Sequence, residues 1–180
     1  MPEQKKYLSR KEQVKLKPAP EDVIPILLDG DMQKNALDFV AHLRANGLKI
    51  SWNSRNGWAV SHEGKALCGM AVCDAGFSGK REGWWIDVGL THFSEYEASI
   101  MNQGLQVFIR DNLTSCKFCR PRGACSRQRS MAILGKETDL CGGAAVHVCD
   151  PNEAAIELIK RLLELEQTAR NEENPERKTQ

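Results

Sequence analysis

The chain has 180 residues, of which 41% are hydrophobic and 27% are charged, and its formal net charge is +1. This is the composition of a globular protein with a core of its own, and the small net charge excludes a global attraction to nucleic acid or to anionic membranes. No run of 18 apolar residues occurs, which excludes a transmembrane helix.

Both ends of the sequence are rich in charge and lack hydrophobic periodicity. Residues 1–19 are predicted to form a flexible leader and residues 171–180 a flexible tail. Residues 1–17 contain no apolar stretch that could act as the core of a signal peptide, so we expect a cytoplasmic protein. A single α+β domain is predicted over residues 20–170.

The first half of that domain predicts one helix followed by strands. Apolar residues recur at helical spacing between Asp29 and Gly47, which suit the start and the left-handed end of a helix. Four β-rich segments follow, with turn signals between the first three, at residues 48–52, 58–62, 65–73 and 84–90. We expect a four-stranded antiparallel meander flanked by helices.

The second half predicts a helix over residues 94–113, a cysteine-rich metal segment over 114–149 and a C-terminal helix. A short strand, residues 131–134, lies inside the cysteine-rich segment. The last helix begins at Asp150–Glu153, where a cap, a proline in the first turn and a capping-box glutamate occur together. Apolar residues then recur at helical spacing from Ala155 to Ala169.

Four of the seven cysteines follow a C-x2-C-x5-C-x15-C pattern: Cys116, Cys119, Cys125 and Cys141. A CxxC pair on a tight turn places two thiolates on one edge of a tetrahedron, the geometry that structural zinc prefers. Every charged residue from Thr114 to Lys136 is basic, and nearby cations favour deprotonated thiols. We therefore predict a zinc-knot segment in which these four cysteines hold a structural zinc ion.

Other interpretations of the cysteines remain open. Four thiolates also hold iron–sulfur clusters, Cys116 and Cys119 alone could form a redox pair, and some of the cysteines could bind nothing. Cys149 or His147, which share one face of a predicted strand, could replace Cys141 as a ligand.

With the cysteines placed, the sequence resembles a group of uncharacterised small four-cysteine proteins from Gram-positive, mostly clostridial, bacteria. The resemblance spans roughly residues 30–170 and is carried by CKFC, Cys125, AILGKET, Cys141 and DPNEAAIELIKRLLELEQ. The chain departs from the family pattern at Thr138–Leu140, where the family has an aromatic residue and a longer step to the cysteine. The resemblance implies a shared fold and metal site, and no activity.

Two functions are compatible with the sequence. The first is a small-molecule-binding or sensing domain, in which Trp58, Trp85 and Asp87 line a pocket. Trp84 and Trp85 are neighbours in one strand and should therefore point to opposite faces, with Trp84 on the apolar one.

The second is a nucleic-acid-binding module that uses basic residues around the zinc knot as phosphate contacts, namely Arg120, Arg122, Arg127 and Arg129. No nucleophilic triad, phosphate-binding loop or HExxH motif occurs. We therefore do not expect an enzyme.

Overall fold

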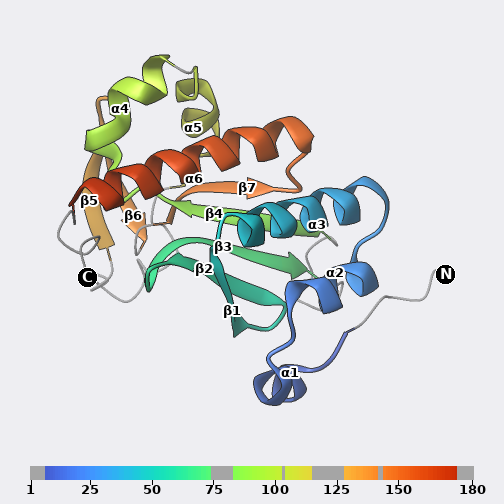
Figure 1. Ribbon diagram of the computed structural model, residues 1–180. Coiled ribbons are helices and arrows are strands. Elements are labelled where there is room, and N and C mark those ends of the chain that lie inside the picture. Colours follow the sequence, from blue (N-terminus) through green and yellow to red (C-terminus); the bar gives the residue numbers. More distant parts are fainter. Residues whose placement is uncertain (1–6, 74–82, 103, 115–127, 142–143, 174–180) are drawn as a thin grey trace. The chain divides into compact units, whose positions relative to one another are not determined.

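The computed structural model describes residues 7–73, 83–102, 104–114, 128–141 and 144–173 (Figure 1). The chain divides into two compact units. Unit 1 comprises Met1–Ile86 and Val148–Glu157, and unit 2 comprises Asp87–His147 and Leu158–Gln180. The chain passes between them within the strands β4 and β7 and the helix α6, so the units are described one at a time.

Within the described residues, unit 1 contains three complete helices and three complete strands. They are α1 (Arg10–Leu16), α2 (Pro20–Leu27), α3 (Gly30–Ala45), β1 (Lys49–Ser54), β2 (Gly57–His62) and β3 (Lys65–Cys73). The first half of β4 (Gly83–Gly89), the end of β7 (Ala144–Cys149) and the start of α6 (Glu153–Glu173) complete the unit.

The sheet of unit 1 follows the predicted meander. β1 pairs antiparallel with β2 and β2 with β3, and β4 is the next neighbour of β3. Trp52 faces Trp58 across the first pair, beside the turn that joins β1 to β2. The α+β class predicted from the sequence is confirmed.

Helix α3 packs its predicted apolar face into the core of unit 1. Ala36, Phe39, Val40 and Leu43 are all buried. The rings of Phe39 and Trp84 lie 6.3 Å apart, so Trp84 belongs to this core. Trp85 is only partly buried, which confirms that the two tryptophans point to opposite faces of β4.

Helix α1 lies where the sequence predicts a flexible leader. Ser9 and Glu12 form a capping box at its start, which satisfies backbone donors of the first turn. The Gln13 side chain is fully buried. Its Nε2 donates to Asn56 Oδ1 at 2.7 Å, and its Oε1 accepts from the Asn56 backbone amide at 2.8 Å. These bonds fix α1 to the β1–β2 turn. The isolated sequence gives no sign of them because both partners are polar.

Unit 2 contains two complete helices and two complete strands among the described residues. They are α4 (Phe93–Asn102), α5 (Gln106–Asn112), β5 (Gln128–Ile133) and β6 (Lys136–Cys141). The end of β4, most of β7 and most of α6 belong to the same unit. Its strands are neighbours in the order β4, β7, β6 and β5.

Two turns of unit 2 depend on left-handed backbone. Gly104, with φ +70°, separates α4 from α5, where the sequence predicts one helix over 94–113. Glycine adopts this conformation without steric cost, so it ends the first helix. Leu134 and Gly135, with φ +50° and +74°, form the tight turn between β5 and β6.

Helix α6 begins at the predicted capping motif, and the residue that caps it is Asn152 rather than Asp150. The Asn152 side chain accepts from the Ala155 backbone at 2.9 Å and is the cap. Asp150 instead accepts from the Trp84 backbone at 2.8 Å. None of the helices in the described ranges combines the length and the apolar character that a bilayer crossing requires.

Candidate functional site

Three of the four predicted zinc ligands, Cys116, Cys119 and Cys125, lie outside the described residues. Cys141 is the last residue of β6. Within the part of the chain that the structure describes, no three histidine, cysteine or acidic side chains gather closely enough to hold a metal ion. We call residues 115–127, which carry these three cysteines, the cysteine segment; Thr114 and Gln128 are the described residues that border it.

Those bordering residues meet at one end of the β6–β7 hairpin. Before the segment, the Thr114 backbone donates to the Ala145 carbonyl at 2.8 Å, and Leu113 bridges Val146. After the segment, Gln128 opens β5 directly opposite Cys141. Since Cys141 in turn pairs with Ala144, both borders of the cysteine segment lie beside the same hairpin end.

The predicted pocket residues have different surroundings. Trp58 is 2% exposed and its indole donates to the Pro18 carbonyl at 2.8 Å, so its ring belongs to the core of unit 1. Trp85 is partly buried on β4. Asp87 lies in unit 2, where its carboxylate pairs with a histidine.

That pair is Asp87 and His147, with Oδ1 and Nδ1 at 2.6 Å and both side chains 37% exposed. A carboxylate in this position fixes the orientation of an imidazole ring. The sequence did not relate the two residues, because they are distant along the chain and meet only through the pairing of β4 with β7.

The predicted phosphate contacts are largely outside the described residues: this holds for Arg120, Arg122 and Arg127. Arg129 is exposed on β5. The two predicted alternatives to Cys141 as a metal ligand are both described. His147 is paired with Asp87, and Cys149 is exposed at the end of β7.

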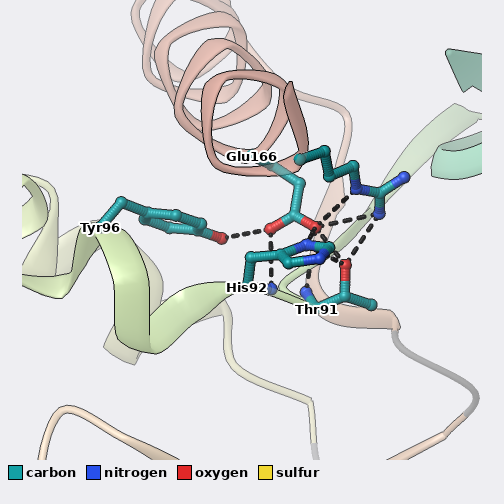
Figure 2. A network of polar contacts seen from close by, with 5 residues as sticks. Thr91, His92, Tyr96 and Glu166 are labelled. Atoms are coloured by element: carbon teal, nitrogen blue, oxygen red, sulfur yellow. Dashed lines mark hydrogen bonds and ion pairs between the residues drawn. The ribbon is translucent and has the colours of Figure 1, made fainter. Parts of the chain in front are cut away.

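In the described part of unit 2, a cluster of polar side chains surrounds Glu166 of α6, a residue that was not among the predicted site residues (Figure 2). Its carboxylate is fully buried. It accepts from Tyr96 Oη at 2.7 Å, from His92 Nδ1 at 2.9 Å and from Arg170 Nε at 3.0 Å. The hydroxyl and backbone of Thr91 and the backbone of His92 also donate to it. Figure 2 shows Tyr96 on one side of the carboxylate and Thr91 with His92 on the other.

These donors determine the charge state of the cluster. Burial, the largest influence, raises the pKa of Glu166, but the hydrogen bonds from Thr91, His92 and Tyr96 together outweigh it and hold that pKa below its usual value. Burial, followed by the nearby Glu166 charge, raises the pKa of the Tyr96 hydroxyl. Tyr96 is therefore neutral and donates to an ionised carboxylate.

The sequence contains one signal for this cluster. Glu166 and Arg170 lie on the buried face of α6, in line with Leu162, Leu163 and Ala169. Two charged residues four positions apart on an apolar helix face predict a buried ion pair. Their partners Thr91, His92 and Tyr96 are about seventy residues away, and no local pattern connects them.

A groove lies in unit 2, and its volume of about 550 Å³ is within the range of small-molecule sites. Helix α4 supplies most of its wall. The lining residues are Ser94, Glu97, Ala98, Met101, Arg110 and Leu134. The opposite face of α4, with Phe93, Tyr96 and Ile100, is buried, and the Tyr96–Glu166 bond fixes that face. One face of α4 is therefore held by these contacts, while the other face lines the groove.

A scan of the chain against protein-family models finds no match, and no curated protein or solved structure matches it either.

Proposed function

We propose that this protein carries a structural zinc ion held by Cys116, Cys119, Cys125 and Cys141. The observation that supports the proposal most is the position of the borders of the cysteine segment, Thr114 beside Ala145 and Gln128 opposite Cys141.

The number of intervening residues limits how far each cysteine can lie from these borders. Since consecutive Cα atoms lie about 3.8 Å apart, Cys116 is within about 8 Å of Thr114, and Cys125 within about 11 Å of Gln128. Cys119 follows Cys116 at the CxxC spacing. The chain that carries three of the cysteines therefore begins and ends beside the backbone of Cys141, which lowers the loop-closure entropy that bringing the four ligands together would cost.

Metal analysis of the purified protein tests the proposal. We expect about one zinc per chain, and loss of the metal in Cys119→Ser and in Cys141→Ser. Cys149→Ser and His147→Gln are the matched controls and should retain zinc. Loss of zinc in either control, with retention in Cys141→Ser, would transfer the fourth ligand to that residue. Iron with sulfide, or no metal at all, would refute the zinc site.

The groove of unit 2 supports a second function, the binding of a small molecule. The residues that line this groove belong to α4, α5 and the β5–β6 turn. A thermal-shift screen of the full chain against a library of metabolites tests it. We expect at least one compound to raise the melting temperature in a saturable manner, and a flat response to the whole library would end this proposal.

Nucleic-acid binding through Arg120, Arg122, Arg127 and Arg129 receives less support, since the net charge of +1 provides no general attraction to phosphates. It predicts retardation of an oligonucleotide that weakens with salt. Absence of retardation at low salt would remove it.

A further inference from the structure

We propose that the groove of unit 2 binds an α-amino acid with an apolar side chain, an inference that rests on the ligand-binding function proposed above. Three features of the groove carry it: an acid, a base and an apolar wall.

The acid and the base of the groove are Glu97 and Arg110. Neither forms a hydrogen bond or an ion pair with any other residue in the described part of the chain, and they do not pair with each other although they line the same groove. The two opposite charges are therefore both available to a third molecule.

An α-amino acid carries the complementary charges on two groups that are bonded to the same carbon atom. Its carboxylate suits the planar guanidinium of Arg110, which donates two parallel hydrogen bonds. Its ammonium group, which only donates, suits the carboxylate of Glu97. The Ser94 hydroxyl both donates and accepts, so it complements either group.

The remaining wall selects the side chain of the ligand. Met101, Ala98 and Leu134 provide apolar surface, and Met101 is 54% exposed. A methionine that is largely open to solvent adapts its shape to different apolar groups. Side chains such as those of leucine, methionine and phenylalanine are therefore favoured over charged ones.

Titration calorimetry of the full chain with L-leucine, L-methionine and L-phenylalanine tests the proposal directly. We expect saturable binding of at least one. For leucine, 4-methylpentanoate lacks the ammonium group and isoamylamine lacks the carboxylate, and each should bind at least about tenfold more weakly, because each leaves one charged partner unmatched.

Substitutions in the groove test which residue binds each charged group of the ligand. Glu97→Gln and Arg110→Gln should each weaken amino-acid binding about tenfold. Arg110→Gln should also abolish the advantage of leucine over isoamylamine, and Glu97→Gln its advantage over 4-methylpentanoate. Glu95→Gln on α4 and Arg161→Gln on α6, both exposed and outside the groove, are the matched controls and should bind as the natural chain does.

The outcomes separate this inference from the ligand-binding function. If other metabolites of the library bind and no amino acid does, the ligand class is wrong and the function stands. Amino-acid binding that is unchanged in both groove variants would place the site elsewhere and overturn the inference. No binding of any compound would overturn both proposals.

Discussion

At the scale of single residues, Glu166 shows how a buried charge is stabilised in this fold. Its carboxylate is removed from water, which is costly unless every lone pair finds a donor. Thr91, His92, Tyr96 and Arg170 supply those donors. Because these residues come from three places in the chain, the carboxylate joins α6 to the end of β4 and to α4.

Replacing Glu166 by glutamine should lower the free energy of unfolding by about 3 kcal/mol, since the Arg170 guanidinium would then be buried without its counter-charge. Urea denaturation measures this. Glu164→Gln, exposed on the same helix, is the control and should change stability by less than about 0.5 kcal/mol. Equal stabilities of the two variants would contradict the role given to Glu166.

The same residue gives stability a defined dependence on pH. The pKa of Glu166 is lower in the folded protein than its ordinary value of 4.5, so the folded state binds the proton more weakly than the unfolded chain does. Its contribution is therefore complete above the ordinary pKa and is lost as the pH falls through the folded pKa. The difference in unfolding free energy between the natural chain and Glu166→Gln should be constant at neutral pH and shrink below about pH 4. A difference that grows in acid would show the opposite sign of shift.

At the scale of elements, the sequence predicted those whose apolar periodicity is strong. The helix after Asp29, the strands around the tryptophans and the C-terminal helix all appear, because burial of one face determines them. It missed α1 and α2, and it joined α4 to α5. Helix α1 is short and polar and depends on a distant partner, and the α4–α5 break depends on the backbone of one glycine.

Candidate site residues were harder to predict for the same reason. The CxxC spacing is a local pattern, whereas the groove of unit 2 combines α4 and α5 with the β5–β6 turn, which lies well beyond both helices along the chain. Asp87 was singled out from the sequence, but its partner His147 emerges only when β4 and β7 become neighbours. Pairing between distant strands leaves no trace in a local pattern.

Helix α1 provides a test at this scale. Gln13→Ala should detach it, because the Asn56 backbone amide and the Trp52 indole, at 2.8 and 3.3 Å from Gln13 Oε1, lose their acceptor. We expect a loss of about 2 kcal/mol of stability and faster amide exchange over residues 10–16. Lys11→Ala, exposed on the same helix, is the control. Unchanged exchange in Gln13→Ala would show that α1 does not depend on this bond.

At the scale of the whole molecule, the two units differ in how they hold together. Unit 1 is built around a core of apolar side chains from α3 and the meander. In unit 2 the described residues combine an apolar core with the buried Glu166 cluster, and the proposed zinc site would add a third source of stability there.

Removal of the metal should therefore act on one unit more than on the other. Structural zinc contributes on the order of 10 kcal/mol to small domains, so a chelator should lower the melting temperature strongly and raise amide exchange first in β5 and β6. Exchange in β1 and β2 is the internal control. Equal effects of chelation on all four strands, or none, would contradict a zinc site bordered by β5 and β6.

Two hairpins of this protein turn in the same way, since Glu63–Gly64 and Leu134–Gly135 are both pairs of residues with positive φ. Only the second contributes a side chain to the groove. A peptide tag inserted between Glu63 and Gly64 should therefore leave ligand binding intact, whereas the same tag between Leu134 and Gly135 would displace part of the groove wall. The Glu63–Gly64 turn is therefore a position for a label, and the Leu134–Gly135 turn is a position where an insertion should block ligand binding, although the backbone conformation is similar in both.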